Sequence, residues 1–579
     1  MYGRSELRPG VEHARPLQPR EHSLSINTLE LIDWRVHLDD WRENRKVQRL
    51  WEGDKSLWTN SDEDRWMGWL DIVDQQLADT THLTALRDDI AQAGFTDALL
   101  LGMGGSSMCP EVLARTFGDQ PGFPKLHVLD STDPSQIRTF EDKVDLDHTV
   151  FIVASKSGST LEPDILRAYF YERAGQAGDR FIAITDPGSK LEATAKADGY
   201  RKILYGLPSI GGRYSALSNF GMTAGAVAGL DVVGILERAR EMAQSCRSSD
   251  PTGNPGVELG LFLGAMANGG RNKLTLLTSP GLQAVGAWLE QLIAESTGKQ
   301  DKAIIPVDLE SVGDADDYDD DRVFAVMQLA GEDAPEPPPD HPAAKIVCNS
   351  PLDIGQEFFR WEVATAVAGS VMGINPFDQP DVEASKIATR ALTDEYESKG
   401  SLPAETPFHT EDGVELFADP EHVDMLIGAD TLEEFLAAHL GLIGKGDYVA
   451  LLAYVEMNAD HERTLQSIRT AIRDQTRAAT CLGFGPRFLH STGQAYKGGP
   501  NQGVVIQITC DDSSNDLAVP GRSYSFGTVK AAQARGDFQV LAERDRRALR
   551  VHLHNVDEGL QRLEKIVAKW RGSISEPPA

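Results

Sequence analysis

Residues 149–160, TVFIVASKSGST, contain an apolar run that changes abruptly into small hydroxyl-bearing residues and a glycine. The β-branched and aromatic run 150–153 is typical of a strand buried in a parallel sheet. The loop after it offers hydroxyl donors, Gly158 lets backbone N–H groups approach a ligand, and the predicted helix 161–174 directs its positive end at the loop. The stretch predicts either a binding loop for a small phosphate or an ordinary turn that caps a helix. Because the chain contains neither GxxxxGK[ST] nor GxGxxG, a sugar phosphate is a better candidate ligand than a nucleotide.

Strand candidates alternate with helical segments on both sides of this stretch. They are 98–101, 127–129, 150–154, 181–185 and 203–205, and then 274–277, 303–307, 322–329, 345–347, 449–455, 504–508 and 549–553. This alternation predicts an α/β fold with mostly parallel sheets covered by helices on both faces. The polar stretch 248–256, SSDPTGNPG, is a candidate linker. We therefore expect a tail and helical extension over 1–84, one α/β domain over 85–247 and a second over 257–579, with an insertion around 390–445.

Composition restricts the partners that the protein can have. The 579 residues include 88 acidic and 56 basic side chains, a formal net charge of −32, which argues against nucleic acid and anionic membranes. Five scattered cysteines without a CxxC pair predict free thiols in a reducing compartment and no zinc site of that kind. The N-terminus lacks the apolar core of a secretory signal, and no run reaches the ~20 apolar residues of a membrane span. These features predict a cytoplasmic protein.

Four further segments place polar residues where strands or helices end: LLLGMGGSSM (99–108), SIGGRYSALS (209–218), AESTGKQ (294–300) and GINPFDQPDVEASK (373–386). Arg213 follows two glycines, a setting that suits oxyanion binding. Glu295 at a helix end could act as a general base. Lys386 lies near a predicted helix start, where its charge opposes the helix dipole. Taken singly, each segment is equally typical of a surface loop or a solvent-facing helix end.

In this order, the segments GMGGSS, SKSGST, SIGGRYS, ESTGK and NPFDQPDVEASK resemble the phosphoglucose isomerase family, aldose–ketose isomerases built from two sugar-isomerase (SIS) domains. The resemblance runs from about residue 85 to residue 390. The segments 49–73 and 485–509, GPRFLHSTGQAYKGGPNQGVVIQIT, are similar to the isomerase half of transaldolase/phosphoglucose isomerase fusions. The stretch before residue 49 is too short for a transaldolase barrel, which needs about 250 residues.

The resemblance implies two SIS-type domains and a role for each matching residue. It implies phosphate binding by Ser155, Lys156, Ser157 and Thr160, sugar contacts by Gly105, Ser106 and Gln291, proton transfer between C2 and C1 by Glu295, stabilisation of a cis-enediolate by Arg213, and ring opening by Lys386. Such a reaction needs a base, one mobile proton and a cation, so we expect neither a metal nor a redox cofactor.

The chain departs from the resemblance at one position. The family usually carries a histidine in a TNGQH segment, whereas the similar text here, STGQAYKGG, follows Lys386 and has Ala495 and Tyr496 at that place. His490 is the imidazole available nearby, and imidazoles suit proton shuttling near neutral pH. We expect His490, from the same or a neighbouring subunit, to assist Lys386 in ring opening. Tyr496 or Lys497 is the alternative.

The resemblance implies an enzyme that interconverts glucose 6-phosphate and fructose 6-phosphate, with a small sugar phosphate as partner and a possible homodimer as assembly. Three alternatives remain at this point. One is a related SIS isomerase acting on a mannose or glucosamine phosphate. The others are a non-catalytic SIS module that senses sugar phosphates and a degenerate, scaffold-like homologue.

Overall fold

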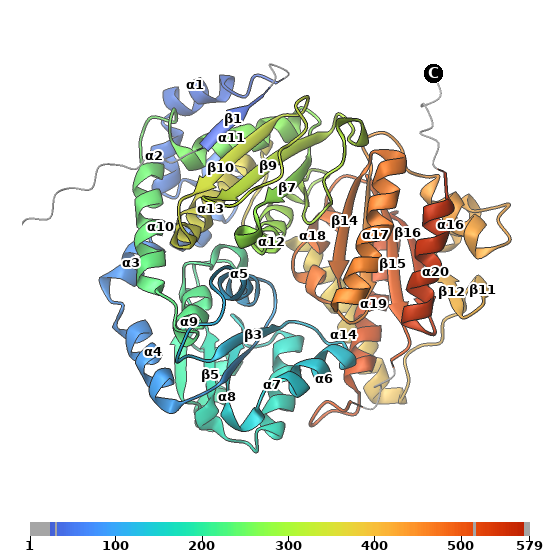
Figure 1. Ribbon diagram of the computed structural model, residues 1–579, viewed down its shortest axis with the longest axis horizontal. Helices are drawn as coiled ribbons and strands as arrows, with labels where there is room; N and C mark the ends of the chain where they lie inside the picture. The colour runs from blue at the N-terminus through green and yellow to red at the C-terminus, as the bar shows by residue number, and fades with distance from the viewer. Residues whose placement is uncertain (1–23, 29–31, 513–516, 572–579) are drawn as a thin grey trace, which may run out of the picture.

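The structure is a computed structural model that describes residues 24–28, 32–512 and 517–571. Its strands form three sheets, each flanked by helices (Figure 1). The predicted α/β fold with parallel sheets and flanking helices is confirmed. Residues 1–23 of the expected N-terminal tail lie outside the described residues. Among the described helices, none has the length and apolar character needed to cross a membrane.

The first sheet has the order β3-β2-β4-β5-β6 and is parallel throughout. Its strands are β2 (Asp97–Gly102), β3 (Lys125–Leu129), β4 (Thr149–Ala154), β5 (Phe181–Thr185) and β6 (Lys202–Tyr205). Alternate strand residues pack on the two helical layers, as the two-residue period of a strand requires. One layer contains α6 (Pro134–Lys143), α7 (Leu161–Arg173) and α8 (Lys190–Ala197), and the other contains α4 (Thr81–Ala93) and α9 (Asn219–Val227). Every residue of β4 is buried, as its sequence predicts.

The second sheet has the order β1-β10-β9-β7-β8, with β1 (Leu24–Asn27) antiparallel at its edge. The other strands are β7 (Lys273–Thr278), β8 (Ile305–Val307), β9 (Arg322–Leu329) and β10 (Ala343–Cys348). One apolar core joins this sheet to α1 (Val36–Glu43), α2 (Lys46–Trp51), α3 (Ile72–Ala78), α5 (Met108–Phe117), α10 (Val232–Cys246), α11 (Pro255–Asn268), α12 (Val285–Thr297) and α13 (Ile354–Met372). Both α10 and α11 pack on α13. The candidate linker 248–256 therefore connects two helices of a single core.

The third sheet has the order β11-β12-β16-β15-β13-β14. Its strands are β11 (His409–Glu411), β12 (Val414–Phe417), β13 (Tyr448–Tyr454), β14 (Ala479–Phe484), β15 (Gly503–Cys510) and β16 (Arg547–Leu553). The last four are parallel, while β11 and β12 add an antiparallel edge. The helices that follow α13 are α14 (Pro380–Lys399), α15 (Pro420–Met425), α16 (Leu432–Leu440), α17 (Ala459–Thr476), α18 (Gly493–Gly498), α19 (Phe526–Ala542) and α20 (Val556–Lys569).

The strands that were expected to share one α/β domain after residue 257 form two separate sheets, one from 273 to 348 and one from 409 to 553. The expected insertion around 390–445 holds the end of α14, the antiparallel edge strands of the third sheet, α15 and α16. The sequence rhythm located the parallel strands other than β14, but it carries no information about which strands are neighbours.

A buried ion pair joins the second and third sheets. Arg322 on β9 donates from Nη1 to Glu310 Oε2 (2.8 Å) and from Nη2 to Glu310 Oε1 (3.1 Å), and both side chains are 0% exposed. Glu310 Oε1 also accepts from the backbone N–H (2.9 Å) and hydroxyl (2.8 Å) of Thr480 on β14. Because the carboxylate serves both sheets, it fixes the position of the third sheet relative to the second.

Candidate active site

The loops after β2 and β4 lie side by side at the carboxyl edge of the first sheet. Gly102 and Ala154, the last residues of the two strands, are partners in the parallel register. The first loop contains the short helix η3 (Gly104–Ser106), in which Ser106 is buried. In the second loop, Ser155 Oγ donates to Thr160 Oγ1 (3.4 Å). The two glycine-containing segments that the sequence singled out are thus brought together.

The loop after β4 has the backbone shape expected for anion binding. Gly158 has a φ of +66°, and a Cβ atom there would lie 2.5 Å from the backbone nitrogen of Leu191, so only glycine fits. Thr160 directly precedes α7, and its side chain makes no capping hydrogen bond to that helix. The Thr160 hydroxyl and the first N–H groups of α7 therefore lie at the helix end that attracts anions.

A cavity of about 540 Å³ opens beside this loop. Its lining combines residues from the range 157–190, which belong to the first sheet and its helices, with residues from the range 382–533. It includes Ser157, Ser159, Thr160, Lys386, His490 and Gln533. Four basic side chains (Lys190, Lys386, Arg390, Arg522) and five acidic ones (Glu162, Asp164, Glu383, Asp394, Glu397) also line it. The volume is within the usual range of small-molecule sites, and the mixed charge suits a ligand with both an anionic group and hydroxyls.

Lys156 is the phosphate candidate whose side chain the structure directs elsewhere. Its ammonium contacts the carboxylate of Asp186 and donates to the backbone oxygens of Leu207 (3.3 Å) and Pro208 (3.4 Å). It is not among the residues that line the cavity. In this structure Lys156 fixes the loop after β4 to the neighbouring loops of the first sheet.

His490 lines the cavity and lies between β14 and α18 of the same chain. It ends the short helix η10 (Arg487–His490), and its Nε2 lies 2.9 Å from Glu162 Oε1 on α7. Gln533 Nε2 on α19 donates to the same Glu162 oxygen (2.7 Å). Burial raises the pKa of Glu162, but the charge of His490 and its hydrogen bond outweigh this effect and hold the pKa below its usual range. A carboxylate thus orients the imidazole at the cavity wall.

The two alternatives to His490 are both buried outside the cavity lining. Tyr496 on α18 packs its ring against Tyr448, with a centroid separation of 5.7 Å. Lys497 forms an ion pair with Asp537 (2.5 Å), and the two side chains are 1% and 0% exposed. Neither residue lines the cavity that contains Lys386 and His490.

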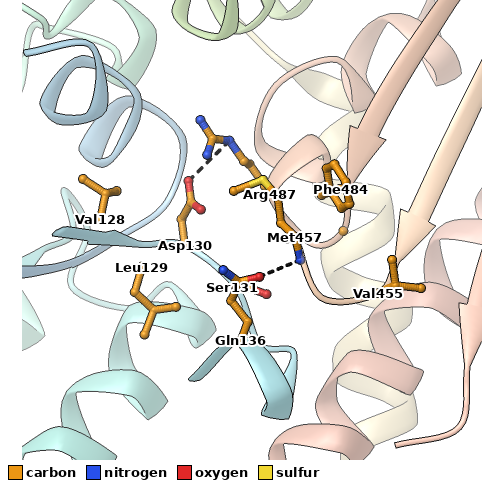
Figure 2. A pocket seen from close by; sticks show the side chains of 10 residues that line it. Val128, Leu129, Asp130, Ser131, Gln136, Val455, Met457, Phe484 and Arg487 are labelled. Carbon is orange, nitrogen blue, oxygen red and sulfur yellow. Dashed lines mark hydrogen bonds and ion pairs between the residues drawn. The ribbon is translucent and has the colours of Figure 1, made fainter. Parts of the chain in front are cut away.

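The helix that carries His490 is held across a seam between the first and third sheets, shown in Figure 2. Arg487 Nε lies 3.6 Å from Asp130 Oδ2, an oxygen that also accepts from Ser107 Oγ (3.0 Å) in the loop after β2. The backbone N–H of Met457 donates to Gln136 Oε1 (2.6 Å). The pocket between them is about 10 Å³, enough for roughly one water molecule, so this seam is an attachment and not a ligand site.

Glu295 lies on α12 in a second, tighter cluster. Its side chain accepts from Gln291 Nε2 (3.3 Å), one helical turn earlier, and Oε2 lies 3.7 Å from Arg213 Nη1. Glu295 is 8% exposed and Arg213 2% exposed. Gln291 Oε1 is buried and has no hydrogen-bond partner among the described residues. A buried carboxylate, a fixed guanidinium and an unpaired amide oxygen therefore converge at one place.

Every nitrogen of the Arg213 guanidinium donates a hydrogen bond. Nε donates to Ser296 Oγ (2.8 Å), Nη1 to Gln379 Oε1 (2.9 Å), and Nη2 to the backbone oxygens of Pro376 (2.8 Å) and Asp378 (2.9 Å). The charge is consequently fixed in position and cannot relax when a ligand binds, as electrostatic stabilisation of a reaction requires.

Two residues that sequence reasoning missed support this arrangement. Lys299, the lysine of ESTGK, donates to the backbone oxygen of Asn375 (2.8 Å) and to Asp378 Oδ1 (2.6 Å). Burial, with the charge of Arg213, lowers the pKa of Lys299 to about 8. Gln494 Oε1 accepts from the first N–H groups of α14, those of Asp381 (2.9 Å) and Val382 (3.1 Å). Each stands inside a motif that the sequence analysis quoted, so the motif itself was the available signal.

The loop after β2 connects the Glu295 cluster to the cavity. A Cβ atom on Gly104, whose φ is +56°, would lie 2.7 Å from Gln291 Nε2 and 3.0 Å from the backbone oxygen of His490. On Gly105 it would lie 2.0 Å from the backbone oxygen of Gly212, one residue before Arg213. The glycines thus allow Gln291, His490 and the Arg213 loop to approach one another. Glu295 and Arg213 are not among the residues that line the cavity.

Lys386 lies in the second turn of α14, and its ammonium is 3.8 Å from Glu383. Its side chain is 44% exposed and lines the cavity together with His490. The structure therefore brings Ser157, Thr160, Lys386 and His490 to one cavity and Gln291, Glu295 and Arg213 to the adjoining cluster.

Part of the chain is similar to known proteins. Residues 43–311 match the protein family described as phosphoglucose isomerase. The glucose-6-phosphate isomerase of Trichormus variabilis is 32% identical over 286 residues, which is 43% of this chain and 52% of that protein. The glucose-6-phosphate isomerase of Rubrobacter xylanophilus is 29% identical over 382 residues, 54% of this chain and 86% of that protein.

A solved structure shows the same fold. The crystal structure of a hypothetical protein from Thermus thermophilus superposes with a TM-score of 0.54 at 23% identity, covering 64% of this chain and 99% of that one. The chain spans only about half the length of the first curated relatives it matches. The matched residues include the loop after β4, Arg213, Gln291 and Glu295, whereas Lys386 and His490 lie beyond them. Over residues 43–311, the chain is thus similar to the phosphoglucose isomerase family.

Proposed function

We propose that this protein interconverts glucose 6-phosphate and fructose 6-phosphate. The observation that carries the proposal is the buried pair of Glu295 and Arg213, 3.7 Å apart, beside a phosphate-type loop and inside the family match. An aldose–ketose isomerisation needs a base for one carbon-bound proton and a cation for the oxygen that becomes negative. A module that only binds sugar phosphates needs neither group.

In the proposed mechanism, Glu295 takes the C2 proton of the open-chain aldose and a C1–C2 double bond forms. The electron pair moves to the C1 oxygen, where Arg213 offsets the charge of the cis-enediolate. The proton of the C2 hydroxyl moves to the C1 oxygen, the same carboxyl group returns its proton to C1, and C2 becomes the carbonyl carbon of the ketose. Gln291 Oε1, which is buried without a partner among the described residues, accepts from a substrate hydroxyl.

The phosphate is assigned to the loop after β4, with Ser155, Ser157, Thr160 and the first N–H groups of α7 as donors. Gly105 and Ser106 in the adjacent loop contact the sugar. Lys156 contributes indirectly, since its contact with Asp186 holds the loop in place. Lys386 and His490 open the ring. They line the cavity of their own chain, so the proposed site draws these two residues from one chain; a homodimer stays a prediction from the resemblance.

The proposal is tested by supplying fructose 6-phosphate and measuring glucose 6-phosphate formation with a coupled dehydrogenase. Turnover of fructose 6-phosphate well above that of mannose 6-phosphate is the expected result. Preference for mannose 6-phosphate or a glucosamine phosphate would instead indicate a related isomerase. Binding of sugar phosphates without turnover would indicate a sensing module.

Thr160→Ala is expected to raise KM for fructose 6-phosphate about tenfold or more while lowering kcat less. The reason is that a hydrogen bond to a charged group contributes about 1.5–3 kcal/mol, and a phosphate contact is equally strong in ground and transition states. Steady-state kinetics measures both constants. Thr464→Ala on α17, which removes a hydroxyl bonded to Asp460 O, is the matched control and should leave KM unchanged. An unchanged KM for Thr160→Ala would remove this hydroxyl from the phosphate site.

His490→Ala is expected to slow turnover of the cyclic sugar phosphate by about 10²-fold, the lower end for a positioned acid–base group. A small open-chain analogue, if accepted, should be affected much less because it needs no ring opening. Tyr496→Phe is expected to keep near-native turnover, since the phenol is buried against Tyr448. Melting temperatures of both variants separate lost chemistry from lost structure. An active His490→Ala together with an impaired Tyr496→Phe would assign ring opening to the phenol.

A further inference from the structure

Two histidines and an aspartate form a compact group on the third sheet, outside the candidate active site. Within the described residues, Asp511, His552 and His554 are a set whose potential ligand atoms all lie within 4.8 Å of one another. No short spacing motif in the sequence marks this group, because Asp511 is about 40 residues from the histidines.

The pairing of three strands creates the group. His552 on β16 is the register partner of Glu415 on β12 and of Thr509 on β15, so these three side chains lie in one row across the sheet. His554 and Asp511 follow two residues later on their chains and therefore project on the same side. The backbone N–H of Asp511 donates to Leu553 O (3.0 Å), which keeps the two segments together past the strand ends.

Each imidazole directs one nitrogen at the aspartate. His552 Nε2 lies 3.0 Å from Asp511 Oδ1, and His554 Nδ1 lies 2.8 Å from Asp511 Oδ2. A tetrahedral ion with bonds of about 2.0–2.1 Å holds neighbouring ligand atoms about 3.3–3.4 Å apart. The two contacts to Asp511 thus need to lengthen by only a few tenths of an ångström, and all the potential ligand atoms already lie within 4.8 Å of one another.

The second nitrogen of each imidazole also has a partner. His552 Nδ1 lies 2.9 Å from Thr509 Oγ1, and His554 Nε2 lies 3.6 Å from Glu415 Oε1. Metal-ligating histidines are oriented in this way, because an outer partner on one nitrogen fixes the tautomer that leaves the other free for the metal. Asp511 and His554 are about half exposed, so an ion can reach the group from solvent.

We propose that Asp511, His552 and His554 bind one divalent transition-metal ion, of the zinc class. Two imidazoles and one carboxylate suit zinc and its neighbours better than magnesium or calcium, which prefer oxygen ligands alone. The ion would connect the end of β15 to β16. The next residue, Asp512, contacts Lys530, which donates to Asp133 Oδ2 (2.8 Å) beside the first sheet, so the ion would also steady this attachment. We assign it a structural role, separate from the proposed isomerisation.

The test is equilibrium dialysis of the whole chain against zinc chloride after chelation, with bound metal measured by mass spectrometry. The His554→Ala variant is expected to bind about one equivalent of zinc less than the unaltered protein. Thr509→Val, which removes an outer partner, is expected to weaken binding by about tenfold or more. His148→Ala is the matched control, because His148 Nδ1 also lies 2.9 Å from a carboxylate, that of Asp145, but without a second histidine. It should bind zinc as the unaltered protein does.

Two further readouts decide the assignment. Zinc should raise the melting temperature of the unaltered protein and of His148→Ala but not that of His554→Ala, since ligand binding to the folded state stabilises it. Removing the metal should leave the turnover of fructose 6-phosphate unchanged. Equal zinc content in the unaltered protein and His554→Ala would overturn the site. If chelation abolished turnover and zinc restored it, the purely structural role of the ion would be overturned. That result would not test the proposed role of Glu295 in proton transfer.

Discussion

Glu295→Gln is expected to lower kcat by about 10²–10⁴-fold, the usual contribution of a positioned general base. The amide has nearly the same shape as the carboxylate but cannot accept a proton from carbon. Arg213 keeps its hydrogen bonds to Ser296, Gln379 and the 376–378 backbone, so the rest of the cluster should stay in place. Calorimetry should therefore show near-native binding of a sugar phosphate while the coupled assay shows the loss of turnover.

The matched control is Glu290→Gln, on the same helix. Burial, together with the charge of Asp308, raises the pKa of Glu290 well above its usual range, which favours the neutral form of its carboxyl group. An amide mimics that state, and Glu290 lines a different cavity from the one that contains His490. Glu290→Gln should keep near-native kcat. If Glu295→Gln also kept it, Glu295 would have no part in the proton transfer.

Glu310→Ala is expected to lower the free energy of unfolding by about 3–5 kcal/mol, because it leaves the buried Arg322 without its counter-charge. The same change leaves the backbone N–H of Thr480 without the carboxylate oxygen it bonds, so both sides of the junction between the second and third sheets lose contacts. Urea denaturation, followed by circular dichroism, measures the difference.

Two further variants distinguish the destabilisation expected for Glu310→Ala from a general effect of losing a charge. Arg463→Ala breaks an ion pair with Asp460 whose side chains are 72% and 80% exposed, and it should cost less than about 1 kcal/mol. The double variant Glu310→Leu/Arg322→Met should lose less than Glu310→Ala alone, because no unpaired charge stays buried. A loss for Glu310→Ala no larger than that for Arg463→Ala would contradict the proposed importance of this junction.

The sequence predicted the strands of the first sheet because each contains a short apolar run, such as the β-branched and aromatic run of β4. It did not predict β14, whose sequence ATCLGF lacks a clear apolar run, nor the short polar strands β11 and β12. It also could not separate the second sheet from the third. Strand pairing is decided by long-range packing, such as the contact of Arg322 with Glu310, which leaves no local pattern.

In the candidate site too, the sequence predicted some features and could not predict others. Motifs located the loop after β4, Arg213 and Glu295, because each stands next to glycines or at a helix end. The direction of a long side chain is not encoded locally, so Lys156 was expected at the phosphate and instead contacts Asp186. The proposed choice of His490 over Tyr496 and Lys497 rests on burial, which only the packing of α18 against β13 and of Lys497 against Asp537 reveals.

The contact between Glu162 and Gln533 has a consequence for the order of events during protein synthesis. The two residues are 371 positions apart, and His490, which shares the same carboxylate, is 328 positions from it. At about 5–20 residues per second, a ribosome needs roughly 20–70 s to travel from Glu162 to Gln533. The first sheet leaves the ribosome long before the far wall of the cavity exists. A nascent chain can therefore display the loop after β4 early, yet it acquires the complete cavity only after Gln533 has been synthesised.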